Sequence, residues 1–228
     1  MRPIERGPSP TLPFNIYREA FEPLSNKLGC YCNYCERRLP TNLAIEHVQP
    51  KSKNKALELE WTNFLLACCN CNSSKGDVAI NLIDYVWPDT HNTLTAFSYA
   101  NGAIKNVLKT SHPAYLKVEA LILLTGLDKD PGHPNKNRRP ENTDLRWKDR
   151  FDLWEKATKS KERLAKDDSL GMREEIVESA LGWGGFGIWF EVFKNDVDMC
   201  VRLIRAFPGT APDCFDNHLP VCRPKEIL

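Results

Sequence analysis

The sequence lacks long apolar runs and has almost no net charge. No stretch of about 18 consecutive apolar residues occurs among its 228 residues, so a transmembrane helix is not expected. The opening segment Met1-Arg-Pro-Ile-Glu-Arg-Gly-Pro also lacks the apolar core of a signal peptide, and we expect a cytoplasmic protein. Because the net charge is only +1, overall charge does not predict nucleic-acid binding.

Cysteine, in contrast, is abundant and clustered. In a reducing compartment this clustering favours a metal site over disulfides, although two disulfides remain the alternative. Two Cys-x-x-Cys pairs predict a tetrahedral structural zinc on Cys32, Cys35, Cys68 and Cys71. The other five of the nine cysteines are expected outside this site. Cys30 and Cys69 lie nearby but do not fit the Cys-x-x-Cys spacing. Cys200, Cys214 and Cys222 are scattered and are expected to be buried.

A Glu46-His47 dipeptide lies between the two pairs, and Asn72 directly follows the second. An imidazole with a pKa near about 6.5 suits a general base, so His47 is a candidate to take a proton from an attacking water. Glu46 and Asn72 offer oxygen ligands to a hard cation such as Mg²⁺, which would stabilise charge on a phosphate. Neighbouring residues on a strand face opposite sides, so Glu46 and His47 can reach one catalytic centre only if the strand ends near His47. Pro50 supports such an end.

The expected elements place this chemistry on two strands and a short helix. Strands are predicted over residues 43–48 and 64–67, and a short helix carrying Lys75 is predicted from about Asn72. Before them, apolar spacing predicts a helix over 14–28 that ends at Gly29. Residues 1–13 are expected to form an extended arm.

The rest of the chain is predicted to be mainly helical. A small hairpin is predicted over 93–108, with its turn at Asn101-Gly102. The aromatic segment 183–193 is expected to be helical core, with a partner-docking surface as the alternative. The final twenty residues contain three prolines and are expected to be a tail. Helices are predicted over 114–124, from an N-cap at Asp144, over 172–181, and over 188–207 with a break at 195–196.

The cysteine-framed segment, about residues 28–80, resembles the HNH endonuclease family. The resemblance implies a ββα-metal core with His47 as general base and Glu46 as acidic metal ligand. It further implies that Asn63 is the loop residue whose hydrogen bonds orient the base, and that Asn72 is the last metal-binding position. Asn72 replaces the final His of the family name, a variant that many members share.

The same resemblance implies two kinds of metal and contacts to nucleic acid. A catalytic Mg²⁺ or Mn²⁺ would act beside the structural Zn²⁺. Lys75 matches a basic residue of the family, placed to contact phosphate. Lys51, in the lysine-rich loop after the Glu-His pair, is a second nucleic-acid-binding candidate.

Three further strings resemble the HNH subunit of Septu-type anti-phage defence systems, some of which are associated with retrons. They are Arg-Pro-Ile-Glu-Arg-Gly-Pro at residues 2–8, Leu-Thr-Gly-Leu-Asp at 124–128, and the glycine- and aromatic-rich segments within 184–211. This resemblance implies an ATPase subunit as partner.

The sequence therefore predicts an α+β protein with a zinc-stabilised ββα-metal core and a mainly helical C-terminal region. We expect an arm and helix over 1–29, a nuclease domain over 30–92, and a partner-binding domain over 93–228. The expected function is metal-dependent hydrolysis of phosphodiester bonds, in DNA more than RNA. The alternative is a zinc-stabilised adaptor that binds nucleic acid or protein without catalysis.

Overall fold

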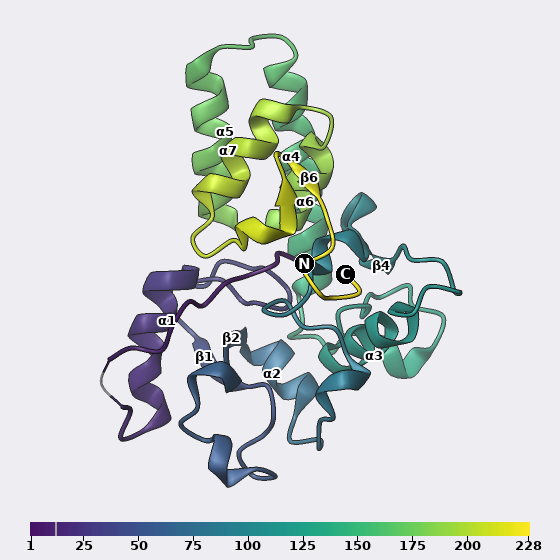
Figure 1. Cartoon of the computed structure of the whole chain (residues 1–228). Coiled ribbons are helices and arrows are strands. Elements are labelled where there is room, and N and C mark those ends of the chain that lie inside the picture. Colours follow the sequence, from purple (N-terminus) through teal and green to yellow (C-terminus); the bar gives the residue numbers. More distant parts are fainter. Residues whose placement is uncertain (12) are drawn as a thin grey trace.

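Two strands and one short helix form the unit that carries the motif residues. A computed structural model of the chain describes residues 1–11 and 13–228 (Figure 1). Strands β1 (Leu43–His47) and β2 (Phe64–Cys68) pair antiparallel over all five residues of each. Helix α2 (Cys69–Lys75) follows β2 directly. The expected ββα order is present, with the helix beginning at Cys69 rather than near Asn72.

Strand β2 is buried along its whole length, because helices pack on the strand pair from both sides (Figure 1). Helix α1 (Phe21–Leu28) covers one side and α2 the other. The helix predicted over 14–28 is shorter, and a 3₁₀ turn at Tyr17–Ala20 precedes it. It ends at Gly29 as predicted, where φ is +74°.

Four helices form a second layer above this unit in Figure 1. Seven of the eight residues of α6 (Phe186–Phe193) are buried, so helical core is confirmed for this part of the predicted aromatic segment. The expectation fails at Trp183, which ends the preceding helix and is 52% exposed. Helix α6 contacts both α4 and α7. The four are α4 (Arg146–Leu164), α5 (Leu170–Trp183), α6 (Phe186–Phe193) and α7 (Val197–Ala206).

Helix α3 (Tyr115–Thr125) belongs spatially with the ββα unit, because it packs against α2. It ends at Gly126, where φ is +64°, as predicted. The hairpin before it pairs β3 (Phe97–Ser98) with β4 (Lys105–Asn106), and its turn uses the left-handed conformation at Asn101-Gly102. Two-residue strands form too few backbone hydrogen bonds to be stable alone, so the hairpin depends on packing against the rest of the chain.

The two chain ends are folded against each other, which corrects the expectation of a tail. Strands β5 (Phe215–Asp216) and β6 (Leu219–Pro220) form a hairpin, and Leu228 is buried. The amide of Asn92 donates to backbone carbonyls on both sides of this hairpin, at 2.7 Å each. The N-terminal arm is extended but buried at Met1 and Ile4, and the two termini lie close together (Figure 1). Prolines shorten these strands without preventing their packing.

Two smaller expectations also fail. The N-cap position of α4 is Leu145, not Asp144, and Leu145 makes no capping hydrogen bond. The Asp144 carboxylate accepts from the Arg146 backbone N–H at 3.3 Å and pairs with its guanidinium at 2.7 Å. Cys222 is exposed, whereas Cys200 and Cys214 are buried as expected. Among the described residues, no helix is both long and apolar enough to cross a membrane.

Candidate metal and catalytic site

The four predicted cysteines converge where β2 meets α2. Their Sγ atoms lie within 4.8 Å of one another, and all four side chains are buried. The Sγ atoms of Cys35 and Cys68 are 3.7 Å apart. A tetrahedron with metal–sulfur bonds of about 2.3 Å has edges of about 3.8 Å, so these donors fit a zinc ion. All nine cysteines are free thiols, and Cys30 and Cys69 lie outside the cluster, as expected.

Positive groups offset the negative charge that such a thiolate cluster carries. Arg146 Nη1 donates to Cys71 Sγ at 3.1 Å, and this side chain is only 1% exposed. Burial opposes the Arg146 charge, but Asp144 and Cys71 raise its pKa above the ordinary value. Backbone N–H groups also donate to Sγ, from Cys71 to Cys68 at 3.4 Å. The surroundings therefore suit a closed, charged metal centre.

His47 ends β1, at the opposite end of the strand pair from Cys68. Its Nε2 lies 2.9 Å from the backbone oxygen of Glu58. A carbonyl oxygen only accepts, so Nε2 carries the proton and Nδ1 keeps a free lone pair. The rings of Tyr17 and Phe64 lie edge-on to the imidazole, with centroids 5.1 and 5.2 Å away. Burial lowers the pKa of His47, and the Glu58 carbonyl opposes this shift, so the ring is neutral at pH 7.

Asn63 fixes the loop that orients this imidazole. Its side-chain oxygen accepts a hydrogen bond from the Gln49 N–H at 2.8 Å. Its amide nitrogen donates to the Gln49 carbonyl at 2.9 Å and to the Leu57 carbonyl at 3.1 Å. These bonds tie the segment after β1 to the segment that supplies the Glu58 carbonyl. A positioning role for Asn63 stays a prediction, and these contacts are compatible with it.

Glu46 and Lys75 form a buried ion pair next to His47. Lys75 Nζ lies 2.7 Å from Glu46 Oε1, and the two side chains are 1% and 3% exposed. The same ammonium donates to the His47 carbonyl at 2.9 Å. Burial raises the pKa of Glu46, and Lys75 opposes this shift. The expected contact of Lys75 with phosphate is therefore not available in this structure, since the side chain points inward from the last turn of α2.

Asn72 and Lys51, the two remaining predicted site residues, both lie between Glu46 and Lys75 in the chain. Asn72 is half-buried in α2, three residues before Lys75 and thus on the same face of the helix. Lys51 is partly exposed, and its Nζ lies 4.0 Å from the centroid of the Tyr17 ring. Tyr17, Glu58 and Arg146 were not among the candidate residues from the sequence. Of these three, only Tyr17 fitted a sequence pattern. That pattern was the apolar spacing of the helix predicted over 14–28, which indicates packing rather than a place beside His47.

Residues 32–78 match the family model described as HNH endonuclease. The match covers about a fifth of the chain and contains the four clustered cysteines together with the segment from Glu46 to Lys75. It supports the HNH resemblance of this segment and indicates a nuclease-like function that acts on nucleic acid. The chain matches no curated protein and no solved structure.

Proposed function

We propose that the protein is a metal-dependent HNH endonuclease that hydrolyses phosphodiester bonds of nucleic acid, DNA in preference to RNA. The observation that carries this proposal is the state of His47. Its Nε2–H is held by the Glu58 carbonyl at 2.9 Å, within a segment that matches the HNH endonuclease model. A neutral imidazole with one nitrogen fixed and the other free is the form that a general base requires.

In the proposed reaction, His47 Nδ1 takes a proton from the water that attacks the phosphorus atom. Asn63 keeps the imidazole oriented through the loop that carries the Glu58 carbonyl. Glu46 and Asn72 are the proposed ligands of a divalent cation, Mg²⁺ or Mn²⁺, which when bound would stabilise charge on the phosphate and on the leaving oxygen. Lys51 is partly exposed beside Tyr17 and is the proposed contact to a backbone phosphate.

The four-cysteine site is proposed to hold a structural Zn²⁺. Two five-residue strands bury too little surface to be stable alone. A metal that joins the segment before β1 to the start of α2 would therefore supply folding free energy.

We further propose that the protein is the cytoplasmic effector of an anti-phage complex and acts with an ATPase subunit. Support comes from the strings that resemble the HNH subunit of Septu-type and retron-associated systems. Two of these strings pack together: Ile4 forms a β-bridge with Thr210, and the Ala211 N–H donates to the Pro3 carbonyl at 3.0 Å. The residues that carry this resemblance at the two ends of the chain therefore lie together, outside the HNH segment.

One observation favours the alternative of a non-catalytic, zinc-stabilised adaptor. The Lys75 ammonium already neutralises Glu46, the carboxylate that would bind the catalytic cation. If that ion pair is permanent, the protein would bind nucleic acid or a partner without cutting.

The two functions are separated by cleavage assays on DNA and RNA with Mg²⁺ or Mn²⁺, for the protein alone and co-purified with its ATPase partner. Wild type should cut. His47→Ala should fold, keep its zinc and lose about 10²-fold or more in rate. His133→Ala, in a surface loop, serves as the matched control and should cut normally. Cleavage by His47→Ala would overturn the nuclease proposal, and a wild type that binds nucleic acid but never cuts would support the adaptor.

A further inference from the structure

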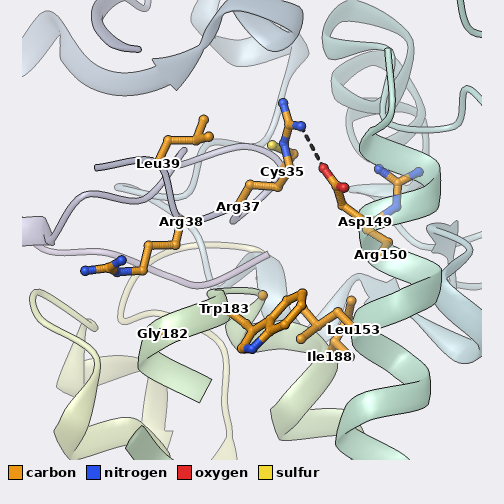
Figure 2. Close-up of a pocket in the computed structure, with 11 residues that line it drawn as sticks. Cys35, Arg37, Arg38, Leu39, Asp149, Arg150, Leu153, Gly182, Trp183 and Ile188 are labelled. Carbon is orange, nitrogen blue, oxygen red and sulfur yellow. Dashed lines mark hydrogen bonds and ion pairs between the residues drawn. The ribbon is translucent and has the colours of Figure 1, made fainter. Parts of the chain in front are cut away.

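A pocket of about 240 Å³ opens between the cysteine loop and the helical layer (Figure 2). It is separate from the proposed catalytic residues, because neither His47 nor Glu46 lines it. The loop after Cys35 forms one wall, α4 a second, and the junction of α5 and α6 a third (Figure 2). The side chains used below are Arg37, Arg38, Asp149, Arg150 and Trp183.

The pocket carries more positive than negative charge. Three arginines and one aspartate line it, although the whole chain has a net charge of only +1. Arg37 pairs with Asp149 at 2.8 Å, as the dashed line in Figure 2 shows. Arg150 is buried and donates to the Gly102 carbonyl. Arg38 is exposed and lies apart from that pair in Figure 2. It lies near the Tyr31 hydroxyl, and its exposed guanidinium can also bind a phosphate.

The side chain of Trp183 is the aromatic part of the same pocket. It is 52% exposed, unlike every other tryptophan of the chain. The indole also lines a neighbouring hollow, where the Lys156 ammonium lies 4.9 Å from the ring centroid. Lys156 does not line the arginine pocket. An exposed indole beside arginines is the combination that binds stacked bases and their phosphates.

The backbone holds the aromatic and cationic sides at a fixed spacing. Arg37 and Gly184 form a β-bridge, and the Gly185 N–H donates to the Glu36 carbonyl at 2.8 Å. Gly184 has φ of +78°, and a Cβ there would lie 2.5 Å from the Glu36 oxygen, so only glycine fits this close approach. Trp183 and Arg38 are the chain neighbours of the bridged residues. A ligand that used both would find them already placed.

We propose that this pocket binds one nucleotide of a single-stranded nucleic-acid segment, with the base on Trp183 and the phosphate on Arg38. The proposal rests on the proposed nuclease function and adds a second contact with the substrate, away from the proposed catalytic residues His47 and Glu46. An acidic peptide would use the arginines but would gain little from the indole face.

Binding is measured with the full-length His47→Ala protein as parent, which holds substrate without cutting it. The probe is a fluorescein-labelled single-stranded oligonucleotide, and the readout is fluorescence anisotropy over a series of salt concentrations. Trp183→Ala should weaken binding by about 10-fold, and Trp183→Phe by less, because phenylalanine keeps a smaller stacking face. Arg38→Ala should weaken binding and reduce the slope of log K against log salt by about 0.7, the value for one phosphate contact. The control is Arg205→Ala, an exposed arginine near the end of α7.

The outcomes separate the pocket from the proposed function. If Trp183→Ala and Arg38→Ala bind like Arg205→Ala, the pocket proposal is wrong, while cleavage by wild type and its loss in His47→Ala would leave the nuclease proposal standing. If a poly-glutamate peptide competes as well as an oligonucleotide of equal charge, the pocket recognises acidic peptide and the nucleotide assignment fails. If the His47→Ala parent binds no oligonucleotide, the nucleotide pocket proposal is also wrong. Cleavage by wild type then tests the nuclease proposal independently of the pocket.

Discussion

Replacing Lys75 with methionine would test the buried ion pair beside the proposed base. The Nζ–Oε1 distance to Glu46 is 2.7 Å and both side chains are almost inaccessible, so water cannot replace the lost ammonium. Removing one partner of a buried ion pair costs about 3–5 kcal/mol, whereas an exposed pair contributes about 0–1 kcal/mol. We therefore expect Lys75→Met to lower the free energy of unfolding by about 3–5 kcal/mol at pH 7.

The effect should depend on pH through Glu46. Burial raises the pKa of Glu46 in the folded protein, and Lys75 opposes that shift, so the variant should have a still higher pKa. A carboxyl group whose folded pKa exceeds its unfolded pKa stabilises the fold below the unfolded pKa, and this stabilisation is lost as pH rises through the folded pKa. The deficit of Lys75→Met relative to wild type should therefore shrink between pH 7 and about pH 4, where the carboxyl is protonated.

The measurement is urea unfolding followed by tryptophan fluorescence, at pH 7 and at about pH 5, with zinc present and no added Mg²⁺. Lys148→Met is the matched control, because Lys148 pairs with Asp152 at 3.1 Å and both side chains are about half exposed. Adding Glu46→Gln to Lys75→Met should recover part of the lost stability, since the unpaired charge is removed. A deficit below about 1 kcal/mol, equal to that of Lys148→Met at both pH values, would refute this account of the site.

Three further predictions follow from the same contacts. Asn63→Ala removes three hydrogen bonds of about 1 kcal/mol each and should reduce both stability and cleavage rate; unchanged cleavage would argue against a positioning role. Because burial lowers the pKa of His47, the midpoint of the acidic limb of the pH–rate profile should lie below about pH 6.5. A midpoint above that value would contradict a buried base. Arg146→Gln removes the donor to Cys71 Sγ and should speed the transfer of zinc to a colorimetric chelator, whereas the exposed Arg163→Gln should not; equal rates would show that the guanidinium does not hold the centre.

The sequence by itself determined the features that depend on neighbours in the chain. The Cys-x-x-Cys spacing closes a short turn in which the Cys71 N–H reaches Cys68 Sγ, so the four cysteines that cluster could be identified without a structure. Short apolar runs predicted both strands, and Gly29 and Gly126 end their helices because each adopts a positive φ. These features are set within a few residues of one another.

Only the tertiary structure decided what surrounds those elements. Lys75 looks like a surface cation because lysine is seldom buried, yet the fold of β1 against α2 places it beside Glu46. Arg146 reaches Cys71 across 75 residues, and no local pattern encodes that contact. Tryptophan is usually a highly buried residue type. However, the positive φ at Gly184 ends the helix directly after Trp183, and the indole lies at the surface. Burial and charge pairing depend on which distant segments meet, and that is decided by packing rather than by local sequence.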